Sequence, residues 1–177
     1  MELMKAIATR QSCRAYTGEQ LTENQLHTVL EAANAAPVGM GKYDEVKLTV
    51  IQNKELLARL DDVGAKFFRN PEVRPTYGAP TVILVSAIIP KSQNNPSSYC
   101  NAACIIENMS LAATDLGLGS VYLLGVAAAL GLEPKLAEEL KVPKGFMPIS
   151  ALALGKSSIT LKERELTDSK IVTDVLK

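Results

Sequence analysis

Residues 99–124, YCNAACIIENMSLAATDLGLGSVYLL, carry the strongest structural signal in the chain. From Tyr99 to about Leu116, small and apolar side chains occupy most sides of a helical projection, and Ser98 stands where a cap for that helix is expected. Residues 120–124 then predict a strand. Because a helix that is apolar on most sides needs cover on those sides, we predict that it lies at the centre of the fold or at a subunit interface.

Shorter signals around this stretch predict further helices and strands. Thr22 and Gln25 form a capping box, which predicts a helix that ends before Pro37. Residues 46–51 alternate as in a half-buried strand, and residues 81–87 form the continuous apolar run typical of a strand buried on both faces. The other predicted elements are helices over 2–9, 56–63 and 134–140, a strand over 149–154 and a polar connection over 90–98.

Composition indicates one globular domain of residues 1–177. Hydrophobic residues make up 47% of the chain and charged residues 21%, which excludes the signature of a disordered protein. The 19 Lys and Arg residues balance the 19 Asp and Glu residues, so no net field attracts a nucleic acid or an anionic membrane, and neither is expected as a partner. Residues 161–177 are more polar, and we expect them to lie along another surface or another subunit.

Cysteine usage predicts a cytoplasmic location. Cys13, Cys100 and Cys104 contain no CxxC pair, which favours neither a disulfide framework nor a metal site. Cys100 and Cys104 are one helical turn apart, and we predict buried packing for both. The uncharged run from Leu116 to Leu132 is interrupted by four glycines, so we interpret it as buried core and not as a membrane span.

The motifs of several common enzyme classes are absent from the sequence. The single histidine, His27, falls on the capped helix, where a surface role is favoured over a Ser/His/Asp or Cys/His catalytic set. No GxGxxG follows a predicted strand, and no GxxxxGK[ST] occurs. Gly117 and Gly119 follow a helix and enter a strand, which is the reverse of the order in a phosphate-binding turn.

Basic residues near both ends of the chain indicate a site for a phosphate. Arg10 and Arg14 flank Ser12, and the end of a helix would bring two guanidinium groups and a hydroxyl to one place. Lys162 and Arg164 are two residues apart and point the same way in an extended segment. A phosphomonoester, which carries nearly two negative charges, suits such a cluster. The alternative, that these residues only offset the dipole of the preceding helix, stays open.

Taken in order, four motifs resemble those of the FMN-dependent nitroreductase family. They are Arg10-Gln11-Ser12-Cys13-Arg14, Ala36-Pro37-Val38-Gly39-Met40, Leu116-Gly117-Leu118-Gly119-Ser120, and Ala153-Leu154-Gly155 followed by Lys162 and Arg164. The resemblance implies an α+β fold, in which helices surround a mixed, largely antiparallel sheet. It also implies an intertwined homodimer with FMN at the interface, in which residues 161–177 form a dimer-exchange arm.

The resemblance also assigns cofactor-binding residues. By similarity, the FMN phosphate and ribityl chain are held by Arg10, Gln11, Ser12, Lys162 and Arg164, with Arg14 toward the ribityl chain and pyrimidine edge. The isoalloxazine is lined from the other subunit by Pro37, Val38, Gly39 and Met40. Flavin N5 is approached by the backbone of Tyr122, Leu123, Leu124 and Gly125, the last of which permits close contact.

The implied activity is a ping-pong electron transfer from NAD(P)H through bound FMN to an electron-poor small molecule such as a nitroaromatic or a quinone. No side chain acts as a catalytic acid or base in the hydride step, because flavin N5 carries the hydride. Two alternatives stay open. Val38 and Gly41 stand where the family usually has Ser and Asn, which favours a flavoprotein with little or no turnover. The other alternative is a cofactor-free dimer that serves as an interaction module.

Overall fold

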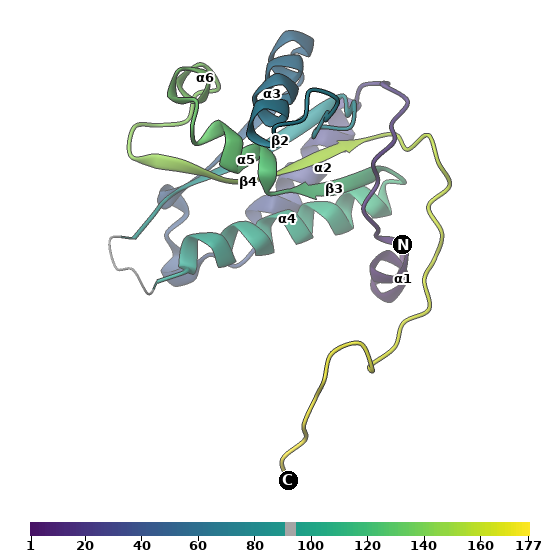
Figure 1. The fold of residues 1–177 in the computed structure, drawn as a ribbon. Helices are drawn as coiled ribbons and strands as arrows, with labels where there is room; N and C mark the ends of the chain where they lie inside the picture. The colour runs from purple at the N-terminus through teal and green to yellow at the C-terminus, as the bar shows by residue number, and fades with distance from the viewer. Residues whose placement is uncertain (91–94) are drawn as a thin grey trace.

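A four-stranded antiparallel sheet, covered by helices on both faces, forms the centre of the computed structural model, which describes residues 1–90 and 95–177 (Figure 1). The strands are Val46–Ile51 (β1), Thr81–Ile88 (β2), Gly119–Leu123 (β3) and Phe146–Gly155 (β4), in the order β1-β2-β4-β3. The helices are Leu3–Thr9 (α1), Glu23–Asn34 (α2), Lys54–Phe67 (α3), Ser97–Asp115 (α4), Gly125–Leu130 (α5) and Pro134–Glu139 (α6). The predicted α+β fold class is confirmed. The predicted connection over 90–98 includes residues 91–94, which lie outside the described residues.

The sheet separates two hydrophobic cores, and β2 contributes to both. Ile83 and Val85 pack with α2 and α4 on one face, while Val82 and Leu84 pack with α3, α5 and α6 on the other. All residues of β2 up to Ala87 are buried, so the prediction of a strand buried on both faces is confirmed. The result is a three-layer arrangement in which the two outer strands, β1 and β3, form the edges of the sheet (Figure 1).

The start of α2 is fixed by the predicted capping box. The Gln25 backbone N–H donates to Oγ1 of Thr22 over 3.2 Å, and the Thr22 backbone N–H donates to Oε1 of Gln25 over 2.9 Å. Each side chain thereby satisfies one of the backbone donors that a helix N-terminus leaves without a partner. The helix ends at Asn34, before Pro37, as predicted.

The long helix α4 differs from its prediction in two respects. Ser98 is not its cap, because the helix begins at Ser97 and the Ser98 hydroxyl donates to the Ile88 carbonyl over 2.6 Å, which ties the helix to the end of β2. Cys100 and Cys104 are exposed, so the prediction of buried packing for them is wrong. The buried stripe of the helix runs through Ala102, Ile105, Ile106, Met109 and Ala113, on the other side.

The uncharged run over 116–132 contains β3, which confirms the strand predicted over 120–124, and a short helix, α5, which was not predicted. Leu118, Val121, Val126 and Leu130 are buried, which confirms the interpretation of this run as core. No helix within residues 1–90 and 95–177 has the length and apolar character needed to cross a bilayer. The strand β4 is also longer than predicted and includes Pro148, which lies opposite Ser86 where the register shifts.

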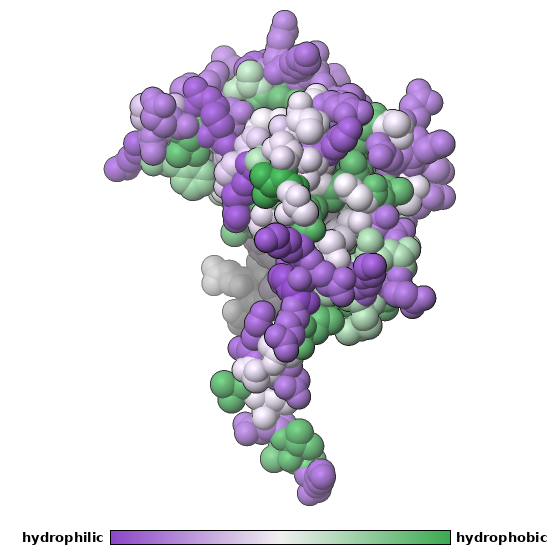
Figure 2. All heavy atoms as spheres, turned by 90° about the vertical axis from the view of Figure 1, so that its right-hand side faces the viewer, coloured by the Kyte–Doolittle hydropathy of each residue, from purple (hydrophilic) through white to green (hydrophobic). Residues whose placement is uncertain are grey.

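The last segment of the chain leaves the folded body after β4. Residues 161–177 contain no helix or strand and extend away from the sheet (Figure 1). Near its end the side chains of Ile171, Val172, Val175 and Leu176 are exposed, Val172 by 95% and Leu176 by 97%. Figure 2 shows this apolar tip projecting from the body of the molecule. These four apolar side chains at the tip therefore bury little surface on their own chain.

The loop between α3 and β2 is attached to α3 by a buried polar contact and by close packing. Asp61 is buried, and its carboxylate accepts hydrogen bonds from the backbone N–H and the hydroxyl of Thr76 over 2.8 and 2.9 Å. One turn further along the helix, Gly64 faces Pro75, and a Cβ on Gly64 would overlap Cγ of that proline. The loop therefore packs so close to α3 that only glycine fits at position 64 without displacing Pro75.

Gly64→Ala should lower the free energy of unfolding by about 1–3 kcal/mol, because the added methyl group pushes Pro75 away from α3. Urea denaturation followed by circular dichroism measures this loss. The control is a double-mutant cycle with Pro75→Ala, which removes the overlapping ring atoms. In that background Gly64→Ala should cost clearly less, and an equal cost in both backgrounds would contradict the proposed contact.

Candidate functional site

Residues 10–14 run beside the edge strand β3 and are held there by the backbone. The Cys13 N–H donates to the Ser120 carbonyl over 2.9 Å, and Ser12 and Ser120 form an isolated parallel bridge. Cys13 is fully buried, and a Cβ on Gly119 would lie only 2.6 Å from its Sγ. Because Gly119 has no side chain, Cys13 can insert against β3 while its neighbours Ser12 and Arg14 remain exposed.

Tyr16 links the same segment to the middle of the sheet. Its hydroxyl lies 2.8 Å from the Cys13 carbonyl and 3.3 Å from the Ala153 carbonyl of β4. Burial raises the pKa of the Tyr16 hydroxyl well above its ordinary value, and the nearby Cys13 thiol acts in the same direction. The hydroxyl therefore stays protonated and remains a donor between the segment and β4.

Three of the predicted phosphate-binding residues, Gln11, Lys162 and Arg164, meet where α1 ends. Arg164 donates from Nη2 to the Ile7 carbonyl over 2.8 Å and from Nε to the Ala8 carbonyl over 3.1 Å. The Gln11 side-chain amide donates to the Lys162 carbonyl over 3.1 Å. Arg164 thus binds the last carbonyls of α1. This contact agrees, for Arg164, with the alternative that the basic residues offset the dipole of the helix.

The two arginines of the first motif contact different neighbours. Nε of Arg10 lies 3.6 Å from Oε1 of Glu107, a residue on the exposed side of α4. The Arg14 guanidinium lies over the ring of Tyr77, 5.7 Å from its centroid, in a cation–π contact. Arg14 therefore connects the basic segment to the loop between α3 and β2.

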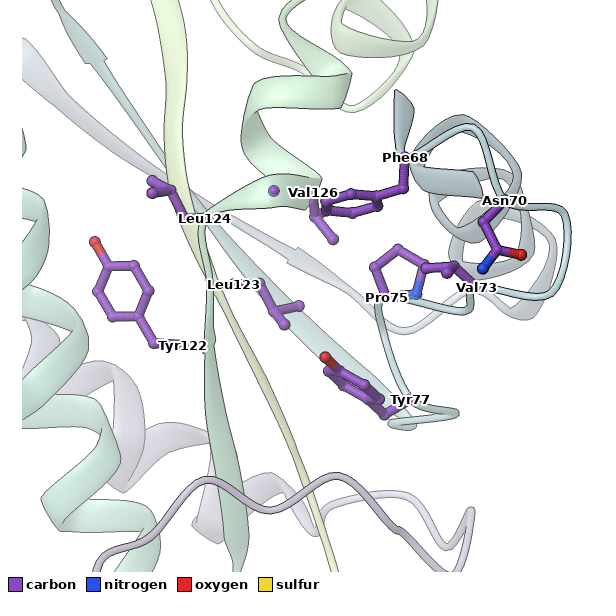
Figure 3. A pocket seen from close by; sticks show the side chains of 10 residues that line it. Phe68, Asn70, Val73, Pro75, Tyr77, Tyr122, Leu123, Leu124 and Val126 are labelled. Atoms are coloured by element: carbon purple, nitrogen blue, oxygen red, sulfur yellow. The ribbon is translucent and has the colours of Figure 1, made fainter. Parts of the chain in front are cut away.

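A pocket of about 420 Å³ lies where β3 passes into α5, next to this loop (Figure 3). Its residues are Phe68, Asn70, Val73, Pro75, Tyr77, Tyr122, Leu123, Leu124, Gly125 and Val126. In Figure 3 Leu123 points toward Pro75 and Tyr77, while Tyr122 lies on the other side of the strand. All four of the predicted residues over 122–125 line this pocket, and its aromatic and apolar walls suit a flat aromatic ring.

Gly125 allows close approach of a neighbouring ring to the backbone at this pocket. A Cβ at this position would overlap the ring of Phe68, so a larger residue would displace that ring. Phe68 also makes an edge-to-face contact with Phe67, with ring centroids 5.2 Å apart. The sequence analysis did not identify Phe68, Asn70 or Tyr77 as site residues. Two aromatic residues at the end of a helix, in a chain with only 5% aromatic residues, were the available signal.

The remaining predicted site residues, Pro37 to Met40, do not meet the pocket within one chain. Val38 is buried in the core between α2 and α4, whereas Leu123 and Val126 belong to the core on the opposite face of the sheet. Pro37 and Gly39 are exposed, as is Met40, which is 84% exposed and has a left-handed φ of 56°. The Gly39 N–H donates to Oδ1 of Asn101 over 3.0 Å, which attaches this loop to α4.

His27 has the surface role that was predicted for it. Its side chain is 74% exposed, and its Nε2 lies 3.3 Å from Oε1 of Glu31 on the same helix. His27 is not among the residues that line the pocket beside Gly125. The pocket and the basic segment thus lie together at the edge of a helix-covered antiparallel sheet, in a protein of the α+β class.

The chain belongs to the nitroreductase family, whose family model, described as "Nitroreductase family", matches residues 7–156. The predicted membership is therefore confirmed. An Archaeoglobus fulgidus protein whose name includes NAD(P)H nitroreductase is 30% identical over 158 residues, which is 87% of this chain and 84% of that protein. An "FMN reductase [NAD(P)H]" of Bacillus subtilis is 25% identical over 172 residues, and the match covers 87% of this chain and 65% of that protein.

Solved structures share the fold over almost the whole chain. The crystal structure of a nitroreductase with bound FMN from Bacteroides fragilis has a TM-score of 0.82 at 28% identity, and the match covers 99% of this chain and 100% of that one. A nitroreductase with bound FMN from Desulfitobacterium hafniense gives a TM-score of 0.85 at 26% identity and covers 99% of both chains. These similarities agree with the three-layer arrangement described above.

Proposed function

We propose that this member of the nitroreductase family binds FMN and transfers electrons from NAD(P)H through it to an electron-poor small molecule, such as a nitroaromatic or a quinone, in a ping-pong reaction. One observation carries this proposal: the basic segment over 10–14 is fixed beside an aromatic pocket at the edge of the sheet. The names of the relatives from Archaeoglobus fulgidus and Bacillus subtilis and the two FMN-bound structures support it.

The residues of the site fit the two ends of FMN. The pocket beside Gly125 has a volume of about 420 Å³, within the range of small-molecule sites, and the aromatic residues Phe68 and Tyr77 suit the isoalloxazine ring. Arg10, with Ser12, would bind the phosphate through charge-assisted hydrogen bonds. Arg14, which already contacts Tyr77, would lie between the two ends and place positive charge near the ring.

When bound, FMN supplies the redox chemistry by accepting a hydride at N5 and passing two electrons to a second substrate. The protein residues bind and orient the reactants. Among the described residues that line the pocket, none carries a carboxylate, an imidazole, a thiol or an amine. The walls would therefore position flat rings, and the missing side chain of Gly125 lets the ring of Phe68 lie against the backbone.

We further propose that residues 1–177 form one domain, which assembles as a homodimer with residues 161–177 as an exchange arm. The apolar tip of this arm lies fully in solvent in one chain, which costs free energy unless a second chain covers it. The pocket lies beside the edge strand β3, so a second chain packed against this edge would reach it. In the dimer, Pro37, Gly39 and Met40 of the second chain would complete the flavin site.

The purified protein should show the absorption spectrum of an oxidised flavin, which bleaches rapidly when NADH or NADPH is added without oxygen and returns when a quinone is added. The control is free FMN with the same donor, which should bleach far more slowly. A bound flavin that persists with both donors would favour the alternative of a flavoprotein with little turnover. A protein that binds no added FMN would contradict the proposal.

Deletion of residues 162–177 should weaken the dimer, because it removes both the apolar tip and the contacts of Arg164 with α1. Sedimentation equilibrium should give a dimer dissociation constant raised by at least about tenfold, equivalent to roughly 1.4 kcal/mol. Val172→Asp tests the tip without shortening the chain, with Thr167→Asp as its matched control. A full-length monomer, or a dimer constant unchanged by both the deletion and Val172→Asp, would contradict the exchange arm.

A further inference from the structure

A second hollow lies directly beside the pocket at Gly125. It has a volume of about 450 Å³, and it forms where α3 ends and the following loop begins. Asn70 lines both this hollow and the pocket, so the two are neighbours. Three cations, Lys66, Arg69 and Arg74, line it together with one carboxylate, Asp62, which gives an excess of positive charge.

These three cations are free of ion pairs within residues 1–90 and 95–177. No carboxylate there lies within 4.0 Å of the charged groups of Lys66, Arg69 or Arg74, although six ion pairs form elsewhere. Asp62 lines the same hollow and still pairs with none of them. Their positive charge therefore stays available to an anion that enters the hollow.

The backbone of the loop holds the guanidinium of Arg74 and fixes the backbone of Arg69. Nη1 of Arg74 donates to the carbonyls of Pro71 and Val73 over 2.7 and 3.0 Å, which fixes the guanidinium plane. Arg69 has a left-handed φ of 52°, and its N–H donates to the Lys66 carbonyl over 3.1 Å. A structural role at the end of α3 explains Lys66, which lies in the last turn, but Arg69 and Arg74 lie beyond the helix.

We propose that this hollow binds the phosphate groups of NAD(P)H while the nicotinamide ring enters the neighbouring pocket. The inference rests on the proposed function and adds to it a subsite for the electron donor. A dinucleotide carries its negative charge on the pyrophosphate, and NADPH carries more on the ribose 2′-phosphate. Both groups take charge-assisted hydrogen bonds from guanidinium and ammonium groups, and an amide such as Asn70 lies between the ring and the phosphates.

The test compares a variant with Lys66→Gln and Arg69→Gln to the FMN-loaded wild type. Its matched control carries Lys54→Gln, on the same helix, and Lys141→Gln, another exposed cation with a left-handed φ, here 60°. Flavin reduction is measured with NADPH, with NADH and with 1-benzyl-1,4-dihydronicotinamide, which has no phosphate. Binding of ADP-ribose and 2′-phospho-ADP-ribose to the FMN-loaded protein is measured by calorimetry.

The kcat/KM for NADH or NADPH should fall at least about tenfold in the first variant, while the phosphate-free donor changes by less than about twofold. The matched control should behave as the wild type. A loss confined to NADPH and 2′-phospho-ADP-ribose assigns the hollow to the 2′-phosphate, and equal losses assign it to the pyrophosphate. Unchanged rates and affinities for every phosphate-bearing probe, or an equal loss with the phosphate-free donor, would overturn the subsite.

The proposed function and the subsite can fail separately in this experiment. A wild-type protein that binds no flavin, or whose flavin is reduced by none of the three donors, contradicts the proposed function. A wild-type protein that is reduced by all three donors, with a Lys66→Gln and Arg69→Gln variant indistinguishable from it, contradicts only the subsite. Retained binding of both ADP-ribose and 2′-phospho-ADP-ribose by this variant would contradict the subsite for the same reason.

Discussion

The insertion of Cys13 against Gly119 is the contact on which the candidate site depends. It holds the segment over 10–14 at the edge of the sheet, where the Cys13 N–H bonds to Ser120 and Tyr16 connects the segment to β4. A side chain on Gly119 would move this segment outward, and the basic residues would then lose their fixed distance from the pocket. The candidate site therefore depends on the packing of residues 10–14 against β3 as well as on the charged residues.

A second attachment orients the opposite wall of the pocket. The buried carboxylate of Asp61 accepts two hydrogen bonds from Thr76, and Gly64 packs against Pro75. Both contacts hold the loop between α3 and β2 against α3. Residues of this loop line both the pocket and the cationic hollow, and Asn70 lines the two together. One rigid loop can thus present a surface for flat rings beside a surface for phosphate groups, as a dinucleotide donor requires.

Sequence signals within one element predicted the helices and strands well. They did not predict contacts between residues that are far apart in the sequence. Thr22 with Gln25 predicted the start of α2, and the apolar run over 81–87 predicted the central strand, because both signals lie within one element. Periodicity could not show which side of α4 is buried, so Cys100 was placed wrongly. Residues 122–125 were identified through family resemblance, but Phe68 and Asn70 approach them only through the tertiary packing of α3.

The central claim is that the basic segment binds a phosphate while the neighbouring pocket binds the ring that carries it. The most direct test is the ratio of the dissociation constants for riboflavin and FMN, which share the ring and differ by the phosphate. FMN should bind at least about tenfold more tightly than riboflavin, equivalent to roughly 1.4 kcal/mol, and Arg10→Ala should remove most of this difference without changing riboflavin affinity. Equal affinities for FMN and riboflavin in the wild type would contradict the account.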